Sequence, residues 1–141
     1  MRPIVISPTY NERKNIDELI EKVLEVDGVH LLVIDDNSPD KTAVRVKERM
    51  ASSNRIHLME RSGKLGLGTA YCDGFKWALD KGYDRIIQMD ADLSHNPKEI
   101  PNLLDATNEY DLVVGSRYIN GVNVVNWPLR RLILSYVANL Y

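Results

Sequence analysis

Two aspartates, Asp90 and Asp92, are the residues of this sequence whose type and spacing point most directly to chemistry. They follow the apolar run Arg85–Met89, which is typical of a buried strand, and residues i and i+2 of an extended segment point to the same side. Two converging carboxylates can share one cation, and oxygen ligands favour a hard ion, Mg2+ or Mn2+. Such an ion would bridge a diphosphate and neutralise its charge as a leaving group. An aspartate-rich turn without a metal is the alternative.

A second acidic pair, Asp35-Asp36, stands at the end of the apolar run that begins at His30. Neighbouring residues of an extended segment diverge, so this pair is not expected to share a metal. One carboxylate should face a ligand crevice and accept hydrogen bonds from a base or ribose. The other should cap the next helix or anchor the turn. Position alone does not say which one faces inward, and structural roles for both are the alternative.

Three arginines near the C-terminus, Arg117, Arg130 and Arg131, are candidate phosphate ligands. The guanidinium group is a planar fork that suits phosphate oxygens better than an ammonium does. Arg117 is the strongest of the three because it follows a predicted strand. For Arg130 and Arg131, a solvated helix face explains the sequence equally well.

The glycine-rich stretch 63–68 lacks both the lysine–hydroxyl ending of a P-loop and a Gly-x-Gly-x-x-Gly fingerprint. We expect either a mobile loop that closes over a sugar or a plain surface turn. His95 lies beside the aspartate pair and can support it. The other histidines, His30 and His57, have no metal-like spacing and are expected to be structural. Three aromatic residues at helical spacing are expected in the core: Tyr71, Phe75 and Trp77.

Short β-branched runs alternate with helical patterns along the chain, which predicts a parallel sheet covered on both faces. Strands are expected at 3–7, 30–35, 55–59, 85–89 and 112–115. Helices are expected over 16–24, after Ser38-Pro39 with Ala43, Val46 and Met50 facing inward, over 69–79, from Asn96-Pro97, and over 127–141. In such sheets, ligands bind beyond the carboxyl ends of the strands, where the polar clusters of this sequence fall.

The composition is that of one globular domain of 141 residues, with 44% hydrophobic and 27% charged residues. A net charge of -2 argues against a nucleic-acid partner. The single cysteine, Cys72, rules out an intrachain disulfide and favours a reducing, cytoplasmic location. No stretch approaches the roughly 20 apolar residues of a membrane-spanning helix.

Five motifs together resemble the dolichol-phosphate mannosyltransferases, which are family 2 glycosyltransferases with the GT-A fold. The motifs are Pro8-Thr9-Tyr10-Asn11-Glu12, Ile34-Asp35-Asp36-Asn37-Ser38-Pro39-Asp40, Lys64-Leu65-Gly66-Leu67-Gly68-Thr69-Ala70-Tyr71, Met89-Asp90-Ala91-Asp92-Leu93-Ser94-His95 and Gly115-Ser116-Arg117-Tyr118. The resemblance runs from Ile4 to about Asn139. It implies a single Rossmann-like GT-A domain over residues 1–141, with a mainly parallel sheet flanked by helices.

The resemblance also implies roles for individual residues. The guanosine of GDP-mannose would be held by Pro8, Tyr10, Glu12, Ile34 and Asp36. The diphosphate and its metal would lie at Asp90, Ala91 and Asp92, with Ser94 as a third ligand weaker than the glutamine of some relatives. Arg117 would contact a donor or acceptor phosphate, and Arg131 would lie near the acceptor with Ser135.

The reaction implied is transfer of mannose from GDP-mannose to a polyprenyl or dolichyl phosphate with inversion. A lipid monophosphate has a second pKa near 6 and is already anionic at pH 7, so no base is required. The apolar residues of 132–140 would contact a membrane surface peripherally, or form an ordinary core helix. Members of this family continue beyond this point, so we expect the C-terminal part of the catalytic domain to be absent. The alternatives are a UDP-sugar transferase, an inactive nucleotide-binding module and, last, a phosphoacceptor receiver domain.

Overall fold

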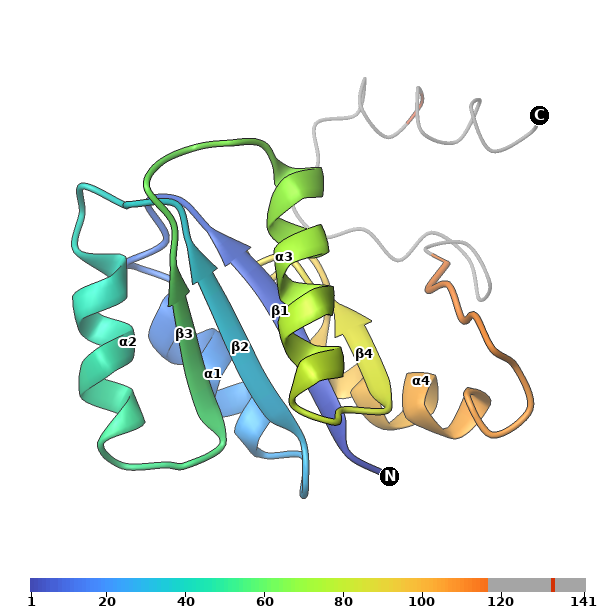
Figure 1. Cartoon of the computed structure of the whole chain (residues 1–141). Helices are drawn as coiled ribbons and strands as arrows, with labels where there is room; N and C mark the ends of the chain where they lie inside the picture. The colour runs from blue at the N-terminus through green and yellow to red at the C-terminus, as the bar shows by residue number, and fades with distance from the viewer. Residues whose placement is uncertain (117–132, 134–141) are drawn as a thin grey trace.

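The computed structural model describes residues 1–116 and residue 133, and it is built on a sheet of parallel strands (Figure 1). The four strands are β1 (Pro3–Thr9), β2 (His30–Asp35), β3 (Ile56–Glu60) and β4 (Arg85–Gln88), arranged in the order β3-β2-β1-β4. The connecting helices are α1 (Ile16–Leu24), α2 (Thr42–Met50) and α3 (Leu67–Asp80), and β4 is followed by a short 3-10 helix, η1 (Pro97–Glu99), and by α4 (Ile100–Ala106). The predicted α/β class is confirmed.

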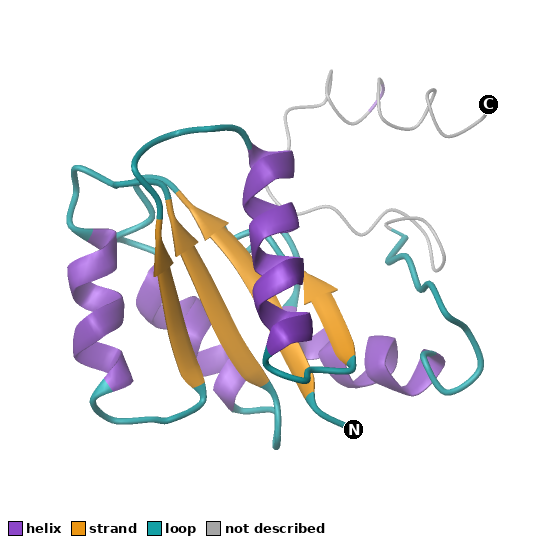
Figure 2. Cartoon of the chain, viewed as in Figure 1, coloured by secondary structure: helices purple, strands orange, loops and turns teal. Residues whose placement is uncertain are grey.

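Helices cover both faces of the sheet (Figure 2). Successive side chains of a strand point to opposite faces, and Ile4 and Ile6 of β1 therefore pack with α3 while Val5 packs with α1, α2 and α4. The strands are continuously apolar because both faces are buried. The stripe predicted for α1 is confirmed, since its apolar residues are buried and Leu24 packs against them: Ile16, Leu19, Ile20 and Val23.

A glycine in the middle of α3 lets that helix approach the sheet closely. A Cβ atom on Gly74 would lie 2.7 Å from Cδ1 of Ile34 and 2.8 Å from Cγ2 of Ile6. Both isoleucines are fully buried, so neither can move aside at low cost. The position therefore requires glycine in spite of the helix propensity that it sacrifices.

Three strands end at the same level of the sheet. Thr9 of β1 is paired with Asp35 of β2, and Asp35 is paired with Glu60 of β3. On the other side of β1, Gln88 of β4 is paired with Ile6, so the residues that follow β4 run beside the last residues of β1. The strand order reverses between β1 and β4, which is the point where open parallel sheets bind ligands.

The start of α2 differs from its prediction. The helix begins at Thr42, because Asp40 accepts hydrogen bonds from the backbone N of Thr42 (3.0 Å) and from its hydroxyl (2.6 Å). Ser38 is not the cap, since its side chain is engaged with the preceding strand end. Within α2, Val46 is buried as predicted, but Met50 is 37% exposed rather than directed inward.

The predicted strand 112–115 is also wrong. These residues form no strand, and Leu112 and Val114 are 81% and 76% exposed. An apolar run alone does not make a strand when no neighbouring strand pairs with its backbone. The helix start predicted at Asn96-Pro97, after β4, is partly confirmed. Asn96 accepts a hydrogen bond from the backbone N of Lys98 (3.1 Å) and opens η1, which leads into α4. Apart from Ile133, the helix predicted over 127–141 lies outside the described residues.

Candidate functional site

The carboxyl ends of the strands surround a small cavity, which we call the carboxyl-edge cavity. Its volume is about 100 Å³, and its lining residues come from the ends of β1 and β2 and from the loop that leads into α3: Pro8, Thr9, Tyr10, Asp36, Lys64 and Leu67. Pairing continues past the strands, since the backbone N of Asp36 donates to the carbonyl of Thr9 (3.1 Å) and that of Arg61 to the carbonyl of Asp35 (2.8 Å). A cavity lined in part by Asp36 and Lys64 therefore lies beyond the strand ends, at the position predicted for the site.

Asp35 anchors the turn after β2. Its side chain is 1% exposed and accepts hydrogen bonds from the hydroxyls of Thr9 (2.8 Å) and Ser38 (2.6 Å) and from the backbone N of Ser38 (2.9 Å). These donors hold the β2 turn against the end of β1. Of the two roles left open for the acidic pair, Asp35 has the structural one.

Asp36 is the member of the pair that lines the cavity. Its carboxylate forms a two-point ion pair with Arg61, with Nε 2.6 Å from Oδ1 and Nη2 2.9 Å from Oδ2. Both side chains are buried, and this bonding raises the pKa of Arg61 although burial opposes it. Sequence reasoning missed Arg61. The available signal was its place, since it directly follows β3 at the same level as the other polar clusters.

Arg61 also ties the glycine-rich loop to the site. Its guanidinium donates to the carbonyl of Gly66 (3.2 Å), to the hydroxyl of Thr69 (2.9 Å) and to Asp73 (3.2 Å). Gly66 has a φ of 101°, a conformation that favours glycine. Within the same loop, the Lys64 ammonium lies 4.7 Å from the ring centroid of Tyr10. These contacts favour a loop that covers the site over an unconnected surface turn.

Asp90 and Asp92 follow β4, but the geometric argument used to pair them does not hold. The strand ends at Gln88, and Asp92 lies in a turn rather than in an extended segment. Leu93 within that turn has a φ of 62°, which is an outlier for a leucine. Such backbone strain is often found at functional sites, where the surrounding structure enforces it. The turn, and not strand alternation, sets the direction of the Asp92 side chain.

Asp90 is half-buried between two ring side chains. The Tyr71 hydroxyl lies 3.4 Å from Oδ1 of Asp90, and Nε2 of His95 lies 3.9 Å from Oδ2. Burial, followed by the charge of Asp90, raises the pKa of Tyr71. The backbone N of Asp90 donates to Nδ1 of His95 (3.1 Å), so His95 supports the aspartate as the sequence indicated. Tyr71 was expected in the core because of its helical spacing, and its contact with Asp90 was missed.

Asp92 is exposed and accepts a hydrogen bond from the backbone N of Ser94 (2.9 Å). Partial burial works against ionisation, but hydrogen bonds from the side chain and backbone of Ser94 and the proximity of His95 outweigh it and lower the pKa of Asp92. In residues 1–116 and 133, no group of three or more His, Cys, Asp or Glu side chains could hold a metal by itself. A cation at Asp90 and Asp92 would need further ligands from a bound molecule or water.

The other predicted site residues differ in the exposure of their side chains at the carboxyl ends of the strands. Glu12 is partly exposed, and its carboxylate accepts a hydrogen bond from the side chain of Asn15 (2.8 Å). The side chain of Ile34 is fully buried under α3, so a nucleotide contact would use its backbone. Ala91 is buried beside the two aspartates. The candidate phosphate ligands of the C-terminal part lie outside the described residues: Arg117, Arg130 and Arg131, together with Ser135.

A parallel sheet whose strand order reverses beside β1, with a cavity at the carboxyl ends of β1 and β2, defines a Rossmann-like α/β domain. The family model for glycosyl transferase family 2 matches residues 4–140. The chain therefore belongs to glycosyl transferase family 2.

Curated relatives narrow the resemblance further. The chain is 49% identical, over 99% of its length, to the polyprenol monophosphomannose synthase of Mycolicibacterium smegmatis, and 42% identical over its whole length to the undecaprenyl-phosphate mannosyltransferase of Micrococcus luteus. It is 40% identical over 96% of its length to the dolichol-phosphate mannosyltransferase of Pyrococcus furiosus. The chain spans 54%, 58% and 38% of these three proteins, respectively.

Solved structures support the GT-A fold. A mannosyltransferase from Pyrobaculum calidifontis, solved in complex with GDP-Man and Mn2+, matches 64% of this chain with 27% of its own length, at 28% identity and a TM-score of 0.55. Staphylococcus aureus TarS matches 92% of this chain with 23% of its own length, at a TM-score of 0.64. At 23% identity, TarS shows the fold alone. Within the described residues, every helix is too short or too polar to cross a membrane.

Proposed function

We propose that this chain is the donor-binding part of an enzyme that transfers mannose from GDP-mannose to a polyprenyl or dolichyl phosphate. The observation that carries the proposal is the position of two polar groups beyond neighbouring strand ends. Asp36 and Tyr10 line the cavity after β2 and β1, and the Asp90–Asp92 turn follows β4, which pairs with β1 where the strand order reverses. Three relatives named for this chemistry and the Pyrobaculum calidifontis complex with GDP-Man support it.

The nucleoside would bind at the carboxyl-edge cavity. Asp36 lines it with a carboxylate whose orientation Arg61 fixes, so that its remaining lone pairs are available to a base or ribose donor. Tyr10 is 40% exposed and lies under Lys64, which gives the ligand one aromatic and one cationic neighbour. Pro8 completes this wall, and Glu12 stands in the loop that follows.

The diphosphate would lie at Asp90, Ala91 and Asp92, together with Mg2+ or Mn2+. The residues present fit such an ion, because carboxylates are hard oxygen ligands and two of them leave coordination positions for phosphate oxygens and water. Ser94 is a weak third candidate, since its side chain is itself hydrogen-bonded to the Asp92 carboxylate. When bound, the ion would neutralise charge on the departing diphosphate. Tyr71 and His95 hold Asp90 in place.

The acceptor would be a lipid monophosphate, which is already ionised at neutral pH and needs no general base. One of its oxygens forms a bond to the anomeric carbon of mannose while the bond from that carbon to the diphosphate breaks, and the electron pair leaves on GDP. Configuration at the carbon is inverted. We propose that Arg117 and Arg131 stabilise the phosphates during this displacement.

Because the acceptor is a lipid, we also propose peripheral contact with a membrane through residues 132–140, which carry an apolar run after two arginines. We propose the cytoplasmic face of the membrane for this contact, because a single cysteine is typical of a reducing compartment. Flotation with liposomes that contain anionic lipid tests it. We expect the protein to float with the liposomes. Its absence from the floated fraction would contradict the proposed membrane contact.

Calorimetry with GDP-mannose and with UDP-glucose, each with and without Mn2+, tests the donor. We expect Mn2+-dependent binding of GDP-mannose and weaker binding of UDP-glucose. Tighter binding of UDP-glucose than of GDP-mannose would mean that the donor is a UDP-sugar. Mass spectrometry after addition of polyprenyl phosphate tests transfer, and binding without the mannosylated lipid would mean that the chain binds nucleotide but does not catalyse by itself.

A further inference from the structure

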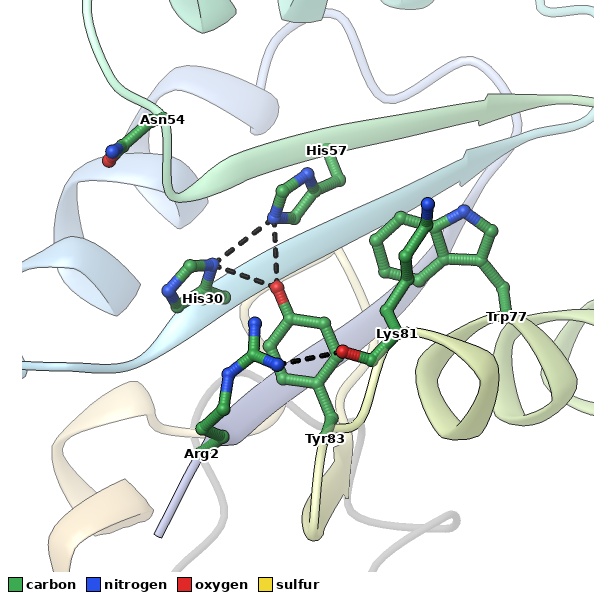
Figure 3. A pocket seen from close by; sticks show the side chains of 7 residues that line it. All are labelled: Arg2, His30, Asn54, His57, Trp77, Lys81 and Tyr83. Atoms are coloured by element: carbon green, nitrogen blue, oxygen red, sulfur yellow. Dashed lines mark hydrogen bonds between the residues drawn. The ribbon is translucent and has the colours of Figure 1, made fainter.

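A larger cavity lies at the opposite edge of the sheet, where the strands begin. We call it the amino-edge cavity, and its volume is about 510 Å³ (Figure 3). Its lining comes from the first residues of β2 and β3, from the residue before β1 and from the end of α3 and the loop after it. His30 and Asp35 are five residues apart on β2, so roughly 16 Å separates this cavity from the proposed donor site. The two cavities are therefore distinct.

The charge of the amino-edge cavity is positive. Its lining includes the cations Arg2 and Lys81, and no carboxylate of the described residues lines it. Two acids stand next to lining residues along the chain, the exposed Asp80 and Asp84. Asp84 accepts a hydrogen bond from the backbone N of Arg2 (2.6 Å) and lies 3.8 Å from the N-terminal ammonium. The Asp84 carboxylate therefore interacts with the N-terminal residues of the chain. Two cations in such a concave site attract an anion.

Arg2 is held in position by the end of α3. Its Nη1 donates to the carbonyl of Lys81 (2.7 Å), and its guanidinium lies 4.7 Å from the ring centroid of Tyr83. The final carbonyls of a helix carry a partial negative charge equivalent to roughly half a unit, so the guanidinium offsets it here and keeps a net positive charge. The helix end therefore does not oppose an anion in the cavity.

Polar and flat side chains form the rest of the wall. The Tyr83 hydroxyl lies 2.9 Å from Nδ1 of His30 and 3.0 Å from Nε2 of His57, and the two nitrogens are 3.1 Å apart (Figure 3). Burial and the nearby cations lower the pKa of both histidines, so that neutral imidazoles line the cavity. Trp77 packs beside them, with its ring centroid 5.1 Å from that of His57. Asn54 adds an amide.

We infer that the amino-edge cavity binds a small molecule carrying a phosphate group, separately from the proposed donor. Arg2 and Lys81 supply the charge that a phosphate requires. The volume exceeds that of a free phosphate ion and lies in the usual range for small-molecule sites. The indole of Trp77 and the imidazole of His57 offer flat surfaces to a ring. A nucleoside monophosphate satisfies both features, so it is expected to bind more tightly than inorganic phosphate.

Trp77 is itself a probe for this cavity. The sequence has two tryptophans, so Trp127→Phe leaves Trp77 as the single one. Its fluorescence is titrated with inorganic phosphate, with AMP and with adenosine. AMP is used in place of a guanine nucleotide to keep occupancy of the proposed donor site low. We expect a saturable change with AMP, a weaker one with phosphate and none with adenosine.

Two lysines of one helix end give the matched comparison. Lys81, directly after α3, lines the cavity, whereas Lys76, five residues earlier in that helix, is exposed and does not line it. Lys81→Met should weaken AMP binding by about tenfold or more, as expected for loss of a charge-assisted hydrogen bond, and Lys76→Met should leave it unchanged. Thermal melting confirms that both variants are folded.

The inference is overturned if neither AMP nor phosphate gives a saturable change, or if Lys81→Met binds AMP as well as Lys76→Met does. Tighter binding of phosphate than of AMP would support the site with a free phosphate ion as its ligand. Because the assay reads Trp77 and requires no transfer, its result does not depend on whether the chain binds GDP-mannose.

Discussion

The guanidinium of Arg61 and the carboxylate of Asp36 form a buried two-point ion pair that joins the ends of β2 and β3. The same guanidinium reaches Gly66, Thr69 and Asp73, so one side chain connects the cavity wall, the glycine-rich loop and the first turns of α3. The orientation of Asp36 is thereby set before a ligand arrives, which reduces the cost of ordering the site.

Arg61→Met is expected to lower the free energy of unfolding by roughly 3 kcal/mol, because it leaves the Asp36 carboxylate buried without its partner. Adding Asp36→Asn should recover part of that loss. The exposed pair Lys47–Glu60 is the control, and Lys47→Met should cost below about 1 kcal/mol. Urea denaturation of the parent and these three variants gives the comparison. Equal costs for Arg61→Met and Lys47→Met would show that the buried pair has no special role.

Gly74→Ala tests the close approach of α3 to the sheet. The added methyl group would overlap Ile6 and Ile34, and we expect a loss of about 1–3 kcal/mol in the free energy of unfolding despite the gain in helix propensity. Gly68 lies in the same helix, and nothing packs within 4 Å of the position that an added methyl group would take there, so Gly68→Ala should not destabilise the protein. Denaturation midpoints in urea measure both. A stable Gly74→Ala variant would mean that α3 packs less tightly than described.

The histidine pair predicts a pH dependence of stability. Burial and neighbouring positive charges lower the pKa of His30 and of His57 below the ordinary value of 6.5. Below about pH 6.5 these histidines bind protons in the unfolded chain but stay neutral in the folded protein. The free energy of unfolding therefore falls as the pH drops from about 6.5 through the folded-state pKa. Above about 6.5 this contribution is constant.

Thermal melting between pH 7.5 and pH 5.5 (a window of roughly one unit either side of the free histidine pKa) checks this dependence. His57→Gln keeps a polar side chain and removes one titrating group, so its melting temperature should fall less over the window. An equal fall in the variant and the parent would assign the pH dependence to other groups.

Much of the scaffold was predictable because periodicity and strand composition are local signals. The bounds of β2 and the buried stripe of α1 match their predictions, since each records one face of one element. The start of α2 does not match its prediction. Ser38-Pro39 resembles a helix cap, but Asp40 accepts the hydrogen bond at the start of the helix, and the Ser38 hydroxyl donates to Asp35 instead. Competition between neighbouring polar residues for the same backbone donors is not visible in a pattern.

The candidate site was predictable in position and less so in its contacts. Arg61 pairs with a residue 25 positions away, and Tyr71 bonds to one 19 positions away, so neither contact leaves a periodic signal. The turn at Leu93 replaced the extended geometry assumed for Asp90 and Asp92. The strand expected at 112–115 failed for a related reason, because strand formation depends on a pairing partner elsewhere in the chain.

Calorimetric titration of GDP-mannose in Mn2+ into the parent chain, Asp92→Ala and Asp105→Ala tests the central claim most directly. Asp92 stands in the turn after β4, whereas Asp105 lies on the exposed side of α4. We expect the parent and Asp105→Ala to bind equally, and Asp92→Ala to lose at least about tenfold in affinity together with its dependence on Mn2+. Unchanged, Mn2+-dependent binding by Asp92→Ala would contradict the proposed metal and diphosphate site.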